Sequence, residues 1–477
     1  MLQLALWLAC AVPEGPVRPD TDAPAVDTDA PAESPVDAPV DTGAPPSTVR
    51  AHPDFNGDGH ANLALGAPGG AGAVYVAWGG TRGPSPTPTR FQRDAWAEVG
   101  ATRDALGASL AAGDLDDDGF DDLAIGAPGA AWVEAPGAGR VLVLYGGPAG
   151  MVPGPTFDLI DLGEGLPVDD ARLGSTLAIA DFDGDGVDDL AVTALQGGPQ
   201  RGGRVHVLRG SSVGLDVSHP LALDQGTPDL FGEVEPDDRF GAALAAADLD
   251  GDGYADLAVG VPNETYLSWS RSGYLNVLWG SPAGLAGDGE EGWFERSPGV
   301  WGITDGDDAF GAAIAAGDAH GDGAADLFVS AITEGVQYFT VLEGGPGGLH
   351  GDTLMLGAAP PALLVPPVTC DVNGDGADEL VTGGDEVNLW GGRRGNLDDR
   401  PVETVTPGDV GQSAWPGRVA VGCLDLDADG YADVVLAAPD AGALWWARGR
   451  ADGLGAARSW EPDLPVPADL LGVTFAR

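Results

Sequence analysis

A nine-residue acidic loop repeats seven times along this chain and constrains the fold more than any other feature. Its clearest copy, Asp248–Asp256, reads DLDGDGYAD and runs directly into the apolar segment Leu257–Val261. Carboxylates stand at positions one, three, five and nine, and a glycine at position six allows a sharp turn. This spacing wraps side-chain oxygens around a hard cation such as Ca²⁺, with the backbone carbonyl of position seven as a further ligand.

The predicted calcium ligands are positions one, three, five, seven and nine of each loop, except for the histidine at position three of the fifth. They are Asp54, Asn56, Asp58, His60 and Asn62; Asp114, Asp116, Asp118, Phe120 and Asp122; Asp181, Asp183, Asp185, Val187 and Asp189; Asp248, Asp250, Asp252, Tyr254 and Asp256; Asp318, Asp322, Ala324 and Asp326; Asp371, Asn373, Asp375, Ala377 and Glu379; and Asp425, Asp427, Asp429, Tyr431 and Asp433. The excluded residue is His320, because an imidazole nitrogen is a poor ligand for a hard cation. We expect up to seven structural calcium ions, with the fifth site the weakest and His320 facing solvent.

Two other structures could carry acidic residues at this spacing. An EF-hand opens the same way but needs a bidentate Glu at position twelve and a helix on each side. Position twelve here holds Leu65, Ile125, Val192, Val259, Val329, Thr382 and Leu436, within short apolar runs typical of strands. The other alternative, an Asp-Gly turn that binds nothing, is disfavoured because the ligand spacing recurs seven times.

The spacing of the loops predicts a repeat architecture. Consecutive loops start 60, 67, 67, 70, 53 and 54 residues apart, which is the size of one four-stranded unit. The strand before each loop is rich in Ala and Gly, as expected where strands converge on an axis. Later strands carry large aromatic residues that fill wider spaces: Trp78, Tyr145, Trp279, Trp390 and Trp445. Residues 50–477 are therefore predicted to form an all-β, monomeric seven-bladed β-propeller of four-stranded antiparallel blades. An open solenoid, the alternative, has shorter repeats.

The two ends of the chain predict how the ring closes. Leu471–Ala476 copies the first-strand pattern of Leu106–Ala111, yet no loop follows it. We expect this C-terminal segment to be the innermost strand of blade one, beside Asn62–Gly66. In the competing arrangement, residues 49–51 take that place.

The first 49 residues are not predicted to belong to the propeller. Residues 1–12 form an apolar start too short to span a membrane, which indicates a secretion signal. Leu8-Ala9-Cys10 resembles the end of a bacterial lipoprotein signal, so a lipid anchor on Cys10 stays open. Residues 13–49 consist mainly of Pro, Asp, Ala, Thr and Val and are expected to be a disordered linker. The expected location is extracellular or the bacterial outer surface, without a transmembrane helix.

The net charge limits the classes of partner that the protein can bind, and the cysteine content limits its disulfides. The formal charge of −52 argues against nucleic acid, because phosphate binding needs a basic surface. Three cysteines, Cys10, Cys370 and Cys423, are too few for a disulfide framework. Cys370 and Cys423 are interpreted as buried small hydrophobic residues. A bridge between them stays open.

Short signatures on both sides of the loop identify a family resemblance. Phe240-Gly241, the loop and Gly260-Val261-Pro262 together resemble the FG-GAP repeat of the integrin α-subunit propeller. The first signature recurs as Leu106-Gly107, Leu173-Gly174 and Phe310-Gly311, and the second as Gly66-Ala67-Pro68 and Gly126-Ala127-Pro128. The resemblance implies a calcium-bound extracellular propeller that serves adhesion or binding. Repeats six and seven depart from it, and the integrin's partner subunit and ligand do not carry over.

The sequence shows no recognisable catalytic motif. The six histidines are scattered, and none lies in a nucleophile elbow or a metal-binding pair such as HExxH. The acidic pairs Asp169-Asp170, Asp237-Asp238 and Asp307-Asp308 are interpreted as solvated charges at one rim. We therefore expect a binding module for an unknown protein or glycan rather than an enzyme. The alternative is a secreted polysaccharide lyase or hydrolase on the same scaffold.

Overall fold

The computed structural model describes residues 53–460, apart from 70–71, 93–103, 133–134, 167, 267–268, 288–291, 301–305, 334–335, 358–365, 385, 393–400, 416–418, 439–442 and 456. All of these belong to the second of two units, Arg50–Arg477. The predicted signal, linker and closing strand, residues 1–12, 13–49 and 470–477, lie outside the described residues. The described part of the chain holds no helix with the length and hydropathy that a membrane crossing needs.

The described elements are strands, with two short 3₁₀ turns, η2 (Pro199–Arg201) and η3 (Pro407–Val410). The strands of the first four sheets are β1 (Leu63–Ala67), β2 (Ala73–Ala77), β3 (Thr89–Gln92); β4 (Ser109–Gly113), β5 (Asp122–Gly126), β6 (Val141–Tyr145), β7 (Val152–Phe157); β8 (Leu173–Ala180), β9 (Asp189–Ala194), β10 (Arg204–Leu208), β11 (Leu221–Leu223); and β12 (Ala243–Ala247), β13 (Asp256–Val261), β14 (Tyr274–Leu278), β15 (Gly292–Trp293). The last three sheets contain β16 (Ile314–Gly317), β17 (Asp326–Thr333), β18 (Val336–Glu343), β19 (His350–Gly357); β20 (Val368–Cys370), β21 (Glu379–Thr382), β22 (Val387–Trp390), β23 (Glu403–Val405); and β24 (Ala420–Leu424), β25 (Asp433–Ala438), β26 (Ala443–Ala447), β27 (Arg458–Trp460).

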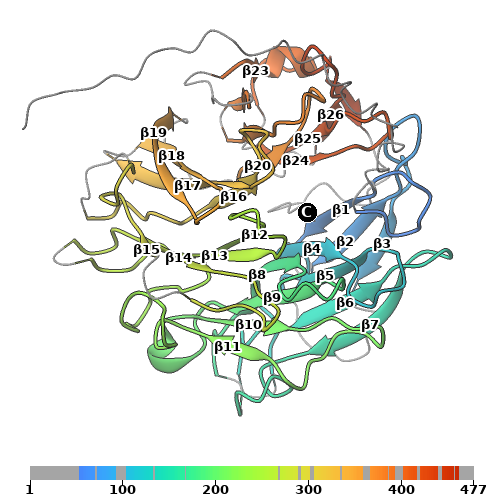
Figure 1. The fold of residues 1–477 in the computed structure, drawn as a ribbon. Helices are drawn as coiled ribbons and strands as arrows, with labels where there is room; N and C mark the ends of the chain where they lie inside the picture. The colour runs from blue at the N-terminus through green and yellow to red at the C-terminus, as the bar shows by residue number, and fades with distance from the viewer. Residues whose placement is uncertain are drawn as a thin grey trace, which may run out of the picture. The chain divides into compact units, whose positions relative to one another are not determined.

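Each sheet is an antiparallel meander whose strands pair in sequence order, and the sheets follow one another around a ring (Figure 1). Six sheets have four strands, and the first has three among the described residues. The first strands of successive sheets, β4, β8, β12, β16, β20 and β24, lie next to one another. They are built from small residues, as in the ALAAA of β12 and the IAAG of β16, because only small side chains fit where strands converge.

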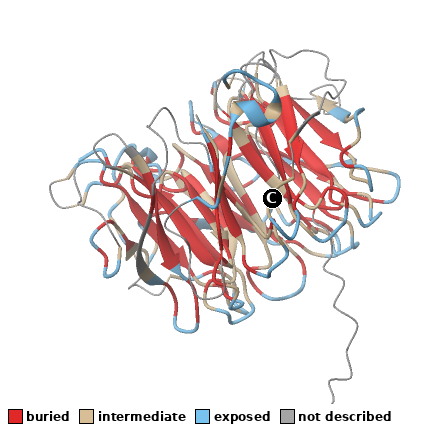
Figure 2. Cartoon of the chain, turned by 90° about the horizontal axis from the view of Figure 1, so that it is seen from above, coloured by how far each residue is buried: buried red, intermediate tan, exposed pale blue. Residues whose placement is uncertain are grey.

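Apolar side chains fill the space between every pair of neighbouring sheets. Figure 2 shows the strands as mostly buried and the connecting loops as mostly exposed. Between blades two and three, for example, Phe157 packs with Leu173 and Val192. Corresponding clusters lie between blades one and two, three and four, four and five, five and six, and six and seven. Burial on both faces of each sheet supplies the main stabilisation of the array.

The ring closes between blades seven and one. Leu444 and Trp446 of blade seven share a buried cluster with Leu63 and Tyr75 of blade one. The N–H of Gly80 donates to the carbonyl of Leu426 at 3.1 Å, which repeats the Ser281 to Phe182 bond between blades four and three at 3.2 Å. The predicted all-β, seven-bladed propeller with four-stranded antiparallel blades is confirmed. The predicted inner strand of blade one stays a prediction.

The signature glycines meet across the boundary between blades. Gly174, with φ of 82°, lies against Gly126 of the preceding blade, where a Cβ would overlap the Gly174 carbonyl oxygen. Gly311 and Gly260 make the same contact between blades five and four, two interfaces further along. The two halves of the repeat signature are therefore one packing feature, because the backbones approach too closely for any side chain.

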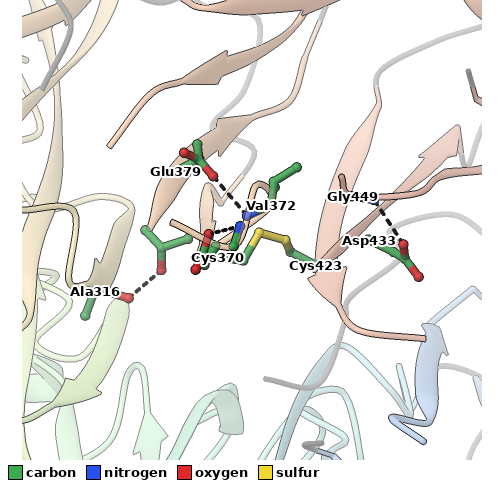
Figure 3. Close-up of a disulfide and its surroundings, with 10 residues drawn as sticks. Ala316, Cys370, Val372, Glu379, Cys423, Asp433 and Gly449 are labelled. Carbon is green, nitrogen blue, oxygen red and sulfur yellow. Dashed lines mark hydrogen bonds between the residues drawn. A yellow bond between two sulfur atoms is a disulfide. The ribbon is translucent and has the colours of Figure 1, made fainter. Parts of the chain in front are cut away.

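Cys370 in β20 and Cys423 in β24 form a disulfide between the inner strands of blades six and seven (Figure 3). Their interpretation as buried small hydrophobic residues is wrong, and the bridge that the sequence left open is present. The strands run side by side and place the two Cα atoms 6.3 Å apart, within the range that a disulfide spans. Such bonds persist in oxidising compartments, in keeping with an extracellular protein.

Candidate metal centre

All seven acidic loops adopt one backbone conformation, held by their first residue. In the fourth loop, Asp248 accepts hydrogen bonds from the N–H groups of Gly251, Asp252 and Gly253 at 2.8, 3.1 and 2.9 Å. The bond from position six, at 2.8 to 2.9 Å, is present in all seven loops. Position six is always a glycine with φ between 83° and 100°, a conformation that other residues rarely adopt.

Position five orients position seven in the same way throughout. The Asp252 side chain accepts the N–H of Tyr254 at 3.0 Å, and the six other loops repeat this bond at 3.0 to 3.2 Å. The predicted ligands at positions one, five and seven are thus placed alike in every loop.

Position nine joins the loop to the blade. Asp256 is 1% exposed, and its two oxygens accept the N–H of Leu249 and the N–H of Gly280, both at 2.8 Å. The first bond closes the loop, and the second fixes the end of the third strand. Asp122, Asp326 and Asp433 make the same two bonds. This residue therefore anchors the fold as well as facing the predicted site.

Four loops bring carboxylate oxygens close enough to share one cation, with ligand atoms within 4.8 Å of one another. These sets are Asp114, Asp116 and Asp122; Asp181, Asp183 and Asp185; Asp248, Asp250 and Asp256; and Asp425, Asp427 and Asp433. They lie in loops two, three, four and seven, which are the loops with carboxylates at all four positions in the sequence.

Buried oxygens without partners fit a bound cation. Oδ1 of Asp116, of Asp183 and of Asp427, all at position three, are buried and accept no hydrogen bond. Burial and neighbouring carboxylates also raise the pKa of Asp122 to about 8 and that of Asp256 to about 7. A hard divalent cation would satisfy these oxygens and favour their ionised forms. The donor set therefore fits Ca²⁺.

Loops one and six deviate from the four-carboxylate pattern. In loop one, the side-chain amide of Asn62 donates to the backbone carbonyl of His60 at 3.1 Å. The His60 carbonyl, a predicted calcium ligand, therefore already accepts a hydrogen bond. Asn56 donates to Asp58 at 3.0 Å within the same loop. In loop six, the longer Glu379 still reaches the N–H of Val372 at 2.9 Å, as the shorter Asp does elsewhere.

Loop five contradicts the expectation that His320 faces solvent. The side chain is 7% exposed, and its Nδ1 lies 2.8 Å from Oδ2 of Asp326. The position-nine carboxylate offers the imidazole a hydrogen-bond partner inside the turn, which offsets the cost of burying it. His320 therefore occupies a carboxylate of its own loop, in line with the expectation of a weak fifth site.

Two arginines contact the loops, and the sequence pattern did not predict these contacts. Arg209 Nη1 lies 2.7 Å from Asp183 Oδ2 in loop three, and Arg448 Nη2 lies 2.6 Å from Asp427 Oδ2 in loop seven. Each stands directly before the glycine that position nine binds. In loops two and four, Tyr145 and Trp279 hold this place.

Position eight was also missed and joins successive loops. The N–H of Asp188 donates to the carbonyl of Asp114 at 3.0 Å, and its carboxylate accepts the N–H of the same residue at 2.9 Å. Asp378 and Asp318 form the same pair between blades six and five, at 2.8 and 3.0 Å. The acidic doublets at positions eight and nine were the available signal.

The opposite face carries the connections between second and third strands and between successive blades. Here Asp169, Asp170, Asp237 and Asp307 are exposed, as predicted. Asp238 and Asp308 are 2% and 3% exposed, so their interpretation as solvated charges is wrong. Asp238 accepts the N–H of Glu235 at 2.6 Å, which places it inside the loop. Its burial, together with neighbouring carboxylates, raises its pKa to about 7.

Aromatic rings stack at the junction of blades three and four. Phe231, which is 44% exposed, lies flat on Tyr274 with ring centroids 4.6 Å apart. Phe294 stacks on Tyr274 at 5.8 Å and contacts Tyr266 at 4.4 Å. An exposed ring held by other rings is a ready contact surface.

A family model of the FG-GAP repeat matches residues 51–77, 106–144, 173–208 and 240–292. Among curated proteins, integrin alpha-4 of Xenopus laevis is 35% identical over 157 residues, covering 32% of this chain and 14% of that protein. Among solved structures, rhamnogalacturonan lyase PL11 of Bacillus licheniformis covers 82% of this chain and 67% of its own, with 11% identity and a TM-score of 0.35. That structural similarity is too low to bear on function.

Phosphatidylinositol-glycan-specific phospholipase D of Rattus norvegicus is 36% identical over 169 residues, covering 35% of this chain and 19% of that protein. This chain matches less than a fifth of the length of this phospholipase D, and less than a fifth of integrin alpha-4. The similarity overturns the expectation that the chain is not an enzyme, because an enzyme stands among its relatives at this identity. The matched FG-GAP repeats, the similarity to integrin α subunits and the seven-bladed ring together support an integrin-like FG-GAP β-propeller for this chain.

Proposed function

We propose that this protein is a calcium-stabilised extracellular binding module that presents one propeller face to a protein or glycan. The division of the ring into two unlike faces carries the proposal. The acidic loops of blades two to seven connect first and second strands, and the loop of blade one leads into β1 in the same way, so they share one face. The opposite face carries longer and more varied connections, such as residues 224–242 and 262–273. Variable loops on a rigid scaffold are where binding residues usually lie.

Calcium has a structural role in this proposal. Up to seven ions would neutralise carboxylates at the loops, with loops two, three, four and seven offering the best donor sets and loop five the poorest. The affinities expected are those of extracellular modules, about 10⁻⁴ to 10⁻³ M. Because hydrogen bonds join loops of neighbouring blades, calcium at one loop would also stabilise the blade next to it.

A second candidate, an enzyme, is favoured by the similarity to phosphatidylinositol-glycan-specific phospholipase D. The substrate would be a glycan or a glycan-bearing lipid, in keeping with that relative's name, and a polysaccharide substrate remains the alternative. The exposed ring of Phe231, on the described loop face, is suited to contacting a sugar.

A binding screen and an activity screen on the same preparation separate the two candidates. The full chain is immobilised, and glycans and matrix proteins are passed over it in calcium and in chelator. We expect calcium-dependent binding that Phe231→Ala weakens, whereas Val213→Ala, which alters an exposed apolar residue on the calcium-loop face, leaves it unchanged. Loss of binding in both variants, or in neither, contradicts the assignment of the face. Release of products from a glycan or glycolipid establishes the enzyme instead.

A further inference from the structure

We propose that Arg209 and Arg448 are built-in counter-ions that weaken calcium binding at loops three and seven and stabilise those loops without calcium. The sequence gives loops two, three, four and seven equal sets of carboxylates. The structure divides them into two pairs, because among the described residues a guanidinium contacts position three in loops three and seven but not in loops two and four.

The contact is made with one oxygen of a shared ligand. Asp183 Oδ2 lies 2.7 Å from Arg209 Nη1, while Asp183 Oδ1 is buried and accepts no hydrogen bond. In loop seven, Asp427 likewise has its Oδ2 at Arg448 and its Oδ1 without a hydrogen bond. The carboxylate is therefore half neutralised by the protein itself and keeps one oxygen for a cation.

Other contacts hold both guanidinium groups in place. Arg209 also donates to the carbonyl of Ala283 in blade four at 3.3 Å, so it bridges two blades. Arg448 lies over the ring of Trp446, with its guanidinium carbon 5.3 Å from the ring centroid. The Arg209 side chain is 58% exposed and that of Arg448 32%, so the charge of Arg448 is less screened by solvent.

Electrostatics sets the direction of the effect. A bound Ca²⁺ at these loops lies one carboxylate away from a fixed positive charge and is repelled by it. At a separation of about 5 Å in a water-like dielectric, this repulsion weakens binding about tenfold. In the absence of calcium, the same arginine offsets the repulsion among the loop carboxylates.

Loops two and four supply the natural comparison. Tyr145 and Trp279 occupy the position of the two arginines and bring no charge. We therefore expect two classes of calcium site among the four-carboxylate loops. Loops two and four form the tighter class, and loops three and seven the weaker class.

Calcium binding to the full chain is measured by titration calorimetry and equilibrium dialysis, for wild type and for Arg209→Gln, Arg448→Gln and Arg271→Gln. Arg271 is the matched control: it pairs with Asp307 on the opposite face at 3.3 Å, so its loss changes the net charge equally but far from the loops. We expect one site to become about tenfold tighter in each loop variant, more so for Arg448→Gln, and less than twofold change in the control.

Thermal unfolding gives an independent measurement. In chelator, both loop variants should melt below wild type, and saturating calcium should remove the difference. Unchanged or weaker calcium binding in both loop variants, or an equal gain in Arg271→Gln, overturns the proposal. A wild-type chain that binds no Ca²⁺ overturns the calcium assignment itself, which is a separate result.

Discussion

Removing the Cys370–Cys423 disulfide should lower the stability of the propeller by up to about 4 kcal/mol. The two cysteines are 53 residues apart, so the bond closes a loop of that length in the unfolded chain. Chain-entropy theory gives about 14 cal/mol/K for such a loop, which is about 4 kcal/mol at 25 °C. The bond also links blade six to blade seven, so its loss should destabilise these last two blades first.

The assay is urea unfolding of the full chain in calcium, followed by tryptophan fluorescence, with and without reductant. We expect reduction to destabilise wild type and the Cys10→Ala control equally. The double variant Cys370→Ala, Cys423→Ala should already be destabilised and should not respond to reductant. Peptide mapping after alkylation under denaturing, non-reducing conditions should find both cysteines protected. Equal stability of wild type with and without reductant would refute the reasoning.

Three further predictions follow from the anchors of the ring. Asp256→Ala leaves two buried N–H groups without acceptors and should cost about 2–6 kcal/mol in urea unfolding, whereas Asp256→Asn keeps one acceptor and should cost less; equal losses would contradict the anchoring role. Asp238 has a folded-state pKa of about 7, above its unfolded value, so its contribution to stability should fall as pH rises from about 4 through 7. The difference in unfolding free energy between wild type and Asp238→Asn should follow that curve, and a pH-independent difference would contradict the prediction. Deleting residues 470–477 should destabilise blade one and make the chain less compact in solution scattering; a truncated chain as stable and compact as wild type would rule out closure by the C-terminal strand.

Much of the fold could be predicted because the repeated loop fixes strand positions on both sides of it. The spacing from Asp248 to Asp256 determines where one strand ends and the next begins, and seven copies determine the number of blades. The Ala-rich strands before several loops, such as Ala243–Ala247 and Ile314–Gly317, likewise indicated which strand lies innermost, because side-chain size limits the approach to the axis.

The residues that were missed depend on contacts between segments that the spacing does not specify. The disulfide needs β20 and β24 to run side by side in one particular register, 53 residues apart in sequence. Arg209 reaches Asp183 only because the third strand ends beside the loop of its own blade. His320 was expected to face solvent because the sequence does not show that the Asp326 carboxylate lies within its reach.

The central claim, that calcium stabilises this propeller through its acidic loops, is tested most directly by thermal unfolding of the full chain in calcium, in magnesium and in chelator. Each occupied site should add about 2.7 kcal/mol when calcium exceeds its dissociation constant a hundredfold. The account predicts a midpoint that rises with calcium concentration and rises much less with magnesium, which requires a stricter octahedral geometry. A midpoint that is the same in calcium and in chelator would contradict it.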